Sequence, residues 1–272
     1  MSKFHRDIER DAIKLRKEYG INGYGIENIF SLIEKMDIIL IRYPMGKDTL
    51  CGFCTVYEGK KVIVSNSNEI LAREIFTIAH EIGHFQYDID NYSNAIKIDK
   101  NIEDDANDKV EQRANLFAAA FLMPKSVLCE YIENELDKSY KELSSIDIVK
   151  IQSEFNVSYS AVVFRLFNLD LISIQHKNKL FEDRKQKTSR FLFDMINADK
   201  NLLYSYNKIY VPSQYFEFVV SNYQNDYVSF DKFKEALNII DVKEEIIEGL
   251  RKEEVIEDDA ENWDDIDFDY FE

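Results

Sequence analysis

The sequence predicts an α+β fold that is mostly helical, with a small three-stranded antiparallel sheet and additional C-terminal helices. The chain has only 8 Gly and 3 Pro among 272 residues, which is typical of helix-rich proteins. Apolar residues recur at helical spacing over most of its length. Residues 37–65 instead favour strands, because β-branched and aromatic residues are frequent there.

Residues 3–36 are predicted to form two helices. Residues 3–19 carry an apolar residue every three or four positions, and a shorter helix is expected over residues 26–36. This segment is charged and lacks the apolar stretch of a signal peptide. The longest apolar run, residues 116–123, is far shorter than the ~20 residues that a membrane-spanning helix needs. The sequence therefore predicts a cytoplasmic protein.

Three strands are expected over residues 37–43, 50–57 and 61–65, separated by short turns that contain glycine. Cys51 and Cys54 form a C-x-x-C pair in the second strand. No second pair of cysteines completes a four-thiolate site, so these residues are interpreted as structural rather than as metal or redox residues.

A long helix is expected over residues 68–87. Its expected cap is Asn66, Ser67 or Asn68. Residues 88–108 are polar and acidic and are predicted to form a loop. The next helix is expected over residues 109–123, where a proline follows.

Further helices are predicted over residues 126–172, and the segment 145–172 has the pattern of a helix-turn-helix. Because this segment holds few basic residues for phosphates, it is interpreted as a packing unit rather than as a DNA reader. Residues 177–190 are locally basic and are expected to form a solvated connector. A last helical region is expected over residues 210–240. Its expected cap is Ser213 or Ser229.

These elements predict a main domain over residues 1–174, a small helical region over 175–251 and an acidic tail over 252–272. The net charge is −17, and residues 253–272 hold eleven acidic residues and no basic one. This charge argues against direct binding of nucleic acid. The tail is interpreted as a disordered, solubilising end. The alternative is a docking or autoinhibitory segment, because aromatic residues alternate with its charges.

The candidate chemistry lies in His80-Glu81-Ile82-Gly83-His84, an H-E-x-x-H motif within the helix expected over 68–87. On a helix this spacing places both imidazoles on one face, where they can hold a zinc ion. The glutamate is then placed as general base for a water. The alternative is a pair of ordinary surface histidines. The apolar helix and the small Ala79 and Gly83, which would let another element approach, argue against it.

A catalytic zinc needs a further protein ligand. Glu111, on the helix expected over 109–123, is well placed to supply it, and Asn115, one turn further, would orient a ligating histidine. Other carboxylates compete from the expected loop, where geometry is less fixed: Glu103, Asp104, Asp105 and Asp108. His5 and His176 are distant in sequence and are interpreted as ordinary side chains.

Two stretches together resemble the ImmA/IrrE metallopeptidases. The first reads A-R-E-I-F-T-I-A-H-E-I-G-H over residues 72–84, and the second reads E-Q-R-A-N-L-F-A-A-A-F-L-M-P over residues 111–124. The family pattern is roughly R-x-x-F-T-x-A-H-E-x-G-H, then E-x-x-A-N-x-F-A-x-x-L-L-M-P. The resemblance extends from the N-terminus to about residue 173. It departs at Arg113, where many relatives have a second glutamate.

This resemblance implies a zincin-like metallopeptidase domain over residues 1–174, with Zn²⁺ on His80, His84 and Glu111 and with Glu81 as catalytic base. It also implies the substrate class, a helix-turn-helix repressor of the XRE type in a prophage, mobile element or toxin–antitoxin-like module. Cleavage would relieve repression. The alternative function is a regulatory module that binds a repressor or DNA without proteolysis, and the intact site residues favour the peptidase.

Overall fold

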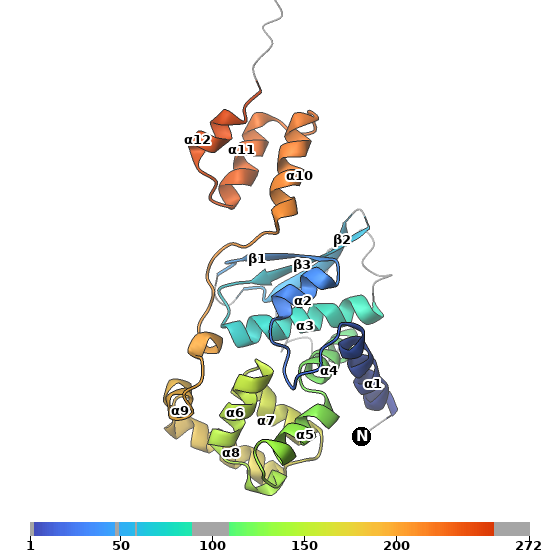
Figure 1. The fold of residues 1–272 in the computed structure, drawn as a ribbon, viewed down its shortest axis with the longest axis vertical. Helices are drawn as coiled ribbons and strands as arrows, with labels where there is room; N and C mark the ends of the chain where they lie inside the picture. Colours follow the sequence, from blue (N-terminus) through green and yellow to red (C-terminus); the bar gives the residue numbers. More distant parts are fainter. Residues whose placement is uncertain (1–2, 47–48, 58, 89–108, 253–272) are drawn as a thin grey trace, which may run out of the picture. The chain divides into compact units, whose positions relative to one another are not determined.

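The computed structural model describes residues 3–46, 49–57, 59–88 and 109–252 (Figure 1). Contacts divide the chain into two compact units, one ending at Pro212 and one beginning at Ser213. Most of the loop predicted over 88–108 lies outside the described residues, and so does the acidic tail from residue 253 onward.

The first unit combines one sheet with helices, and the predicted α+β class is confirmed. Its elements are α1 (Lys3–Glu18), α2 (Ile29–Lys35), β1 (Ile38–Tyr43), β2 (Gly52–Tyr57), β3 (Lys60–Asn66), α3 (Leu71–Tyr87), α4 (Lys109–Leu122), α5 (Lys125–Asn134), η2 (Tyr140–Glu142), α6 (Ser145–Phe155), α7 (Tyr159–Asn168), α8 (Ile174–Gln186), α9 (Ser189–Met195) and η3 (Lys200–Leu203). The expected strands and the helices around the H-E-x-x-H motif all form within a few residues of their predicted ends.

The sheet is mixed, which corrects the prediction of an antiparallel sheet. Its strand order is β1-β3-β2. β2 and β3 form an antiparallel hairpin, whereas β1 lies parallel to β3, with Leu40 opposite Ile63. The connection from β1 to β2 therefore skips one position, and the hairpin returns β3 into the gap. Consecutive strands are usually neighbours, so the alternating pattern alone predicted the strands but not their order.

Helix α3 runs along one face of this sheet (Figure 1). Its close approach to β2 depends on Gly52, where a Cβ atom would lie 2.6 Å from Thr77 Cγ2 and 2.9 Å from the carbonyl oxygen of Val64. Both distances are shorter than van der Waals contact. The missing side chain therefore lets the strand lie against the helical turn that precedes His80.

A buried ion pair joins β1 to the first turn of α3. Arg42 donates from Nε and Nη2 to the two carboxylate oxygens of Glu74, at 2.8 and 2.7 Å. Ser65 Oγ donates to the same carboxylate at 2.8 Å. The Arg42 guanidinium lies 4.1 Å from the ring centre of Phe30 and 4.0 Å from that of Tyr206. These contacts satisfy the charge of Glu74 and fix α3 against the sheet.

Residues 204–210, called the edge segment here, lie beside β1 and the start of α3. Tyr210 and Arg42 exchange backbone hydrogen bonds of 2.8 and 2.9 Å on the outer edge of β1. The backbone N–H of Leu71 donates to the carbonyl of Tyr204 at 2.9 Å. The edge segment thereby provides backbone partners for a strand position and a helix start.

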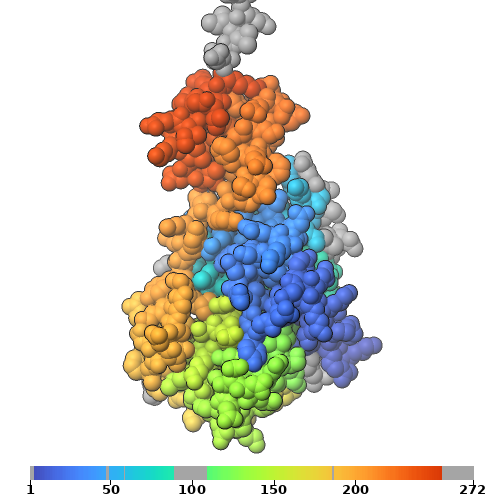
Figure 2. Space-filling view, viewed as in Figure 1, coloured from blue at the N-terminus to red at the C-terminus, as the bar shows by residue number. Residues whose placement is uncertain are grey.

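The core of the first unit lies between α3, α4 and the surrounding helices. Phe117 and Phe121 on α4 are fully buried and stacked, with ring centres 5.5 Å apart. Arg16 on α1 donates to the carbonyl of Phe121 at 3.0 Å, and burial lowers the pKa of Arg16 to about 10. Figure 2 shows the N-terminal residues, in blue, directly against residues in green from the middle of the sequence. α1 and α4 are thus held together by apolar and polar contacts.

The predicted N-cap of α3 at Asn66, Ser67 or Asn68 is wrong. The N-cap is Ile70, which makes no side-chain cap bond. Asn66 instead holds the β1–β2 connection, where it accepts from the backbone N–H of Met45 at 3.0 Å and donates to the carbonyl of Leu50 at 2.9 Å. Because a polar side chain can bond either to a helix end or to a neighbouring loop, its position in sequence does not decide between them.

Residues 177–190 are mostly helical rather than a connector. Ser173 caps α8, where its Oγ accepts from the backbone N–H of His176 at 3.2 Å. α8 buries Leu180 and α9 buries Leu192 and Phe193 in the core of the first unit. The contacts of residues 175–212 therefore lie with the first unit, which ends at Pro212. The periodic signal in α8 is weak because Leu180 is its one fully buried apolar residue.

The helix-turn-helix segment forms α6 and α7, joined through Asn156 in the left-handed conformation at φ 54°. α7 has one basic residue, Arg165, and this side chain is buried in an ion pair with Glu9. Its Nε also donates to the carbonyl of Met123 at 2.9 Å. The one basic side chain of α7 therefore bonds to groups inside the first unit. This agrees with the packing interpretation.

The second unit consists of α10 (Ser213–Gln224), α11 (Phe230–Ile239) and α12 (Glu244–Gly249). It has its own small core, in which Tyr223 and Phe233 stack with ring centres 4.4 Å apart. Ser229 caps α11, as predicted, with its Oγ accepting from the backbone N–H of Lys232 at 3.4 Å.

Candidate metal centre

Helix α3 carries the H-E-x-x-H motif in its buried third and fourth turns. His80, Glu81 and His84 are at most 1% exposed. The two imidazole rings lie on the same face, one turn apart, with ring centres 4.6 Å apart and planes 76° apart. Such polar groups are costly to bury without partners. Their burial in an otherwise apolar helix therefore indicates a site rather than a solvated surface.

Glu111 reaches this face from α4, because the two helices approach closely at Gly83. A Cβ atom on Gly83 would lie 3.1 Å from Phe117 Cδ1 and 3.2 Å from the Cα of Ala114. Small residues on both helices thus bring the first turn of α4 over the two histidines. The sequence-based expectation that Gly83 lets another element approach is confirmed, and Glu111 is 3% exposed.

Three donor atoms of these side chains form a tight triangle. His80 Nε2 lies 2.9 Å from His84 Nε2 and 3.1 Å from Glu111 Oε2. The distance between His84 Nε2 and Glu111 Oε2 is 3.4 Å. A tetrahedral ion with bonds of about 2.0–2.1 Å separates its ligand atoms by roughly 3.3 Å. The three residues therefore fit a metal ion of this kind without rearrangement.

Each histidine has an oxygen beside its second ring nitrogen. Asn115 Oδ1 lies 2.9 Å from His80 Nδ1. Asp88 Oδ2 lies 3.7 Å from His84 Nδ1. An acceptor at Nδ1 keeps the proton on that nitrogen and leaves Nε2 as the electron-pair donor. The predicted role of Asn115 has the required geometry, whereas Asp88 was not predicted. Its four-residue spacing from His84 is the signal in the sequence that could have found it.

Of the other residues considered from the sequence, His5 and His176 do not join this triangle. Glu103, Asp104, Asp105 and Asp108 lie outside the described residues. His176 Nε2 lies 2.8 Å from the carbonyl oxygen of Leu143, far along the chain from the motif. His5 lies at a cavity of about 400 Å³ beside Arg165. Across the described ranges, His80, His84 and Glu111 are the one group of at least three such side chains close enough to share an ion.

The C-x-x-C pair also lies apart from the donor triangle. Cys51 and Cys54 are both buried, at 2% and 1% exposure. Neither belongs to a group of metal-donor side chains in the described part of the chain. The structural interpretation of these cysteines is therefore consistent with their burial in the sheet region.

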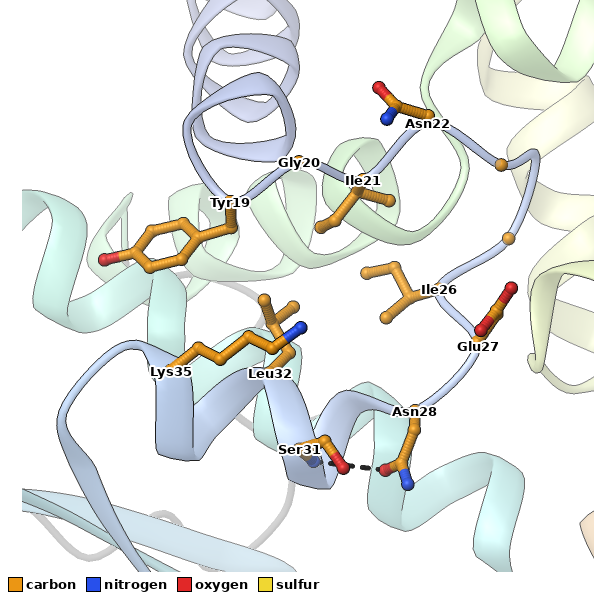
Figure 3. A pocket seen from close by; sticks show the side chains of 12 residues that line it. Tyr19, Gly20, Ile21, Asn22, Ile26, Glu27, Asn28, Ser31, Leu32 and Lys35 are labelled. Atoms are coloured by element: carbon orange, nitrogen blue, oxygen red, sulfur yellow. Dashed lines mark hydrogen bonds between the residues drawn. The ribbon is translucent and has the colours of Figure 1, made fainter.

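A cavity of about 410 Å³ lies between α1 and α2 and does not include the donor triangle (Figure 3). It is lined by the glycine-rich connection after Tyr19 and by Lys35. Asn28 at its rim caps α2, accepting from the backbone N–H of Ser31 at 3.2 Å.

In the described ranges, no helix combines the length and apolar character needed to cross a membrane.

Comparison with known proteins places the same region in a peptidase family. Residues 33–167 match the family of the IrrE N-terminal-like domain, peptidase M78. The chain is also 26% identical to Metallopeptidase ImmA of Bacillus subtilis (strain 168) over 119 residues, which cover 44% of this chain and 68% of that protein. The residues that match the family include α3 and α4.

Proposed function

The chain belongs to the ImmA/IrrE family of metallopeptidases, and we propose that it is a zinc-dependent endopeptidase that cleaves a helix-turn-helix repressor. The observation that carries this proposal is the buried triangle of donor atoms on His80, His84 and Glu111, with sides of 2.9, 3.1 and 3.4 Å. Glu81 lies between the two histidines in sequence and is 1% exposed.

The chemistry of the donors supports zinc as the metal. Two imidazoles and one carboxylate are a ligand set of zinc peptidases, which leaves a fourth position for water or substrate. In this proposal His80, His84 and Glu111 hold the ion, and Asn115 fixes the ring of His80 through Nδ1. A bound zinc ion would supply Lewis acidity, which lowers the pKa of water and polarises the peptide carbonyl.

Glu81 is the proposed general base. Its carboxylate accepts a proton from the attacking water and passes it to the leaving amine as the peptide bond breaks. Glu81 is shielded from bulk water at 1% exposure, so a water bound at the proposed metal site would be its nearest proton donor. The close contact between α3 and α4 holds the three donors in place, so little reorganisation is needed during the reaction.

The proposed substrate is a repressor of the XRE type, encoded near the enzyme in a prophage, mobile element or toxin–antitoxin-like module. This part rests on the family resemblance of residues 72–84 and 111–124. Cleavage would remove the repressor and turn on its target genes. A cytoplasmic location follows from such a substrate.

Co-expression with the neighbouring repressor tests the proposal. The wild-type protein is compared with Glu81→Gln, which keeps the side-chain volume but removes the base, and with Glu111→Ala, which removes a metal donor. We expect the repressor to disappear only with the wild type. The Glu81→Gln protein should still contain one zinc ion, measured by elemental analysis, whereas Glu111→Ala should not.

The outcomes separate the two functions that the sequence left open. If the repressor is lost equally with all three proteins, proteolysis by this site is wrong. If the repressor stays intact with all three but co-purifies with the protein, the non-proteolytic binding module is the better description. Glu217→Gln, an exposed glutamate on α10, is the matched control and should behave as the wild type.

A further inference from the structure

We infer that Asp88 and Arg113 form a positioning pair for His84, in which Asp88 orients the imidazole and Arg113 holds Asp88. This inference rests on the proposed function, since it concerns how one donor of the proposed zinc site is held. It adds residues that neither the H-E-x-x-H motif nor Glu111 includes.

Asp88 lies at the end of α3, one helical turn beyond His84. Its backbone N–H donates to the carbonyl of His84 at 2.7 Å. Its side chain is only 4% exposed, although the helix has ended. Burying a carboxylate costs free energy unless other groups pair with it. Two groups lie beside it, one at each oxygen.

The first partner of Asp88 is Arg113 on α4. Its Nη2 donates to Asp88 Oδ1 in an ion pair. The guanidinium also lies 5.1 Å from the ring centre of Tyr87, and the Tyr87 hydroxyl donates to Asp11 on α1 at 3.2 Å. Burial and the nearby Asp11 carboxylate raise the pKa of Tyr87, so this hydroxyl keeps its proton. Arg113 is therefore held from two sides.

The second group beside Asp88 is His84. Asp88 Oδ2 lies 3.7 Å from His84 Nδ1 and accepts no hydrogen bond from the described residues. A histidine that offers Nε2 to a metal carries its proton on Nδ1, and that proton needs an acceptor. Asp88 Oδ2 is buried beside this nitrogen and is placed to receive that proton. Asp88 Oδ2 thus lies beside Nδ1 of His84, as Asn115 Oδ1 lies beside Nδ1 of His80.

The charge of Arg113 explains why the site tolerates this carboxylate. Glu81, Asp88 and Glu111 bring three acidic side chains close to one ion site, and all three are buried. Like charges at short range destabilise one another in a buried environment. Arg113 offsets one of these charges through its ion pair with Asp88. Arg113, which departs from the family pattern in the sequence, therefore forms an ion pair with Asp88 in the structure.

The test measures Zn²⁺ affinity by competition with a chromogenic chelator, for the full-length protein. Asp88→Asn should lower the affinity by about 10–100-fold, the usual effect of losing such a partner. Arg113→Gln should lower it less, and Arg113→Lys should restore most of the loss because the positive charge returns. The double variant should match Asp88→Asn alone, since Arg113 acts through Asp88. The Co²⁺ absorption bands should shift in Asp88→Asn, because the ligand field of His84 changes.

A matched control is the exposed ion pair between Lys232 and Glu235 on α11, which are 2.7 Å apart. Lys232→Gln and Glu235→Gln should leave Zn²⁺ affinity unchanged. If Asp88→Asn and Arg113→Gln bind Zn²⁺ as the wild type does, and only the thermal midpoint of the metal-free protein falls, the pair is structural and the inference is wrong. Failure of the wild type itself to bind Zn²⁺ would instead overturn the proposed zinc site.

Discussion

Two buried clusters of polar side chains lie about two turns apart on α3, and they differ in what surrounds the carboxylate. Glu74 receives two hydrogen bonds from Arg42 and one from Ser65, so its charge is balanced within the protein. Around His80 the described close neighbours include two other electron-pair donors, His84 and Glu111. The comparison shows that burial of charge alone does not mark a site. A cluster whose members all donate electron pairs requires a cation or protons from elsewhere.

The largest expected effect separates the clusters by metal binding. Glu111→Gln keeps the volume of the side chain but removes the anionic donor. We expect Zn²⁺ affinity to fall by more than about 100-fold, beyond the range for the loss of a ligand's partner, and peptide cleavage to fall to background. Because the amide fills the same space, the metal-free unfolding free energy should change by less than about 1.5 kcal/mol. Isothermal titration and urea unfolding measure the two quantities.

The second prediction concerns the other cluster. Arg42→Met leaves Glu74 buried without its cation and should lower the unfolding free energy by about 3–5 kcal/mol. The Zn²⁺ affinity, measured where the protein is folded, should stay at the wild-type value. The double variant Arg42→Met with Glu74→Leu removes both charges and should recover much of the loss. Equal instability of the single and double variants would contradict this account of the ion pair.

Metal removal gives a third, intermediate effect. An ion that binds only the folded protein stabilises it by about 2.7 kcal/mol at a free concentration of 100 Kd. A chelator should therefore lower the unfolding free energy of the wild type and of Arg42→Met by the same amount, and both thermal midpoints should fall. It should leave Glu111→Gln unchanged. A chelator effect that persists in Glu111→Gln would place the stabilising ion somewhere other than the donor triangle.

The smallest effect tests a carboxylate that belongs to neither cluster. Burial raises the pKa of Asp147, but hydrogen bonds from Lys138 and Ser144 outweigh this and hold the pKa below its ordinary 3.8. The ionised form thus stabilises the fold above pH 3.8, and this contribution is lost as the pH falls through the lower folded pKa. Asp147→Asn should cost less than about 1 kcal/mol at pH 6, because the Lys138 side chain is 38% exposed and solvent screens its charge. The difference from wild type in urea unfolding should vanish at low pH.

The residues of the candidate site could be proposed from the sequence because each helical pair depends on local spacing. His80 and His84 are one helical turn apart, and so are Glu111 and Asn115, so helix periodicity alone puts each pair on one face. The structure brings all four together. What periodicity could not supply is the contact between the two helices, which depends on the small Gly83.

Other features depend on partners that are distant in sequence. Arg42 and Glu74 are 32 residues apart, and nothing in their local sequence identifies the pairing. The position of β3 between β1 and β2 depends on which strands pair with one another rather than on strand composition. The link from Arg113 to Asp88 crosses from α4 to α3. In the sequence, Arg113 was visible only as a departure from the family pattern.

The edge segment has a consequence for how the protein can be shortened. The range that matches the peptidase family ends at residue 167, yet Tyr206 covers the Arg42 guanidinium and Tyr210 bonds to the Arg42 backbone. A chain cut before residue 204 would expose this ion pair to water and leave a strand position open to pairing between molecules. The smallest piece suited to expression therefore extends past Tyr210, well beyond the residues that identify the family.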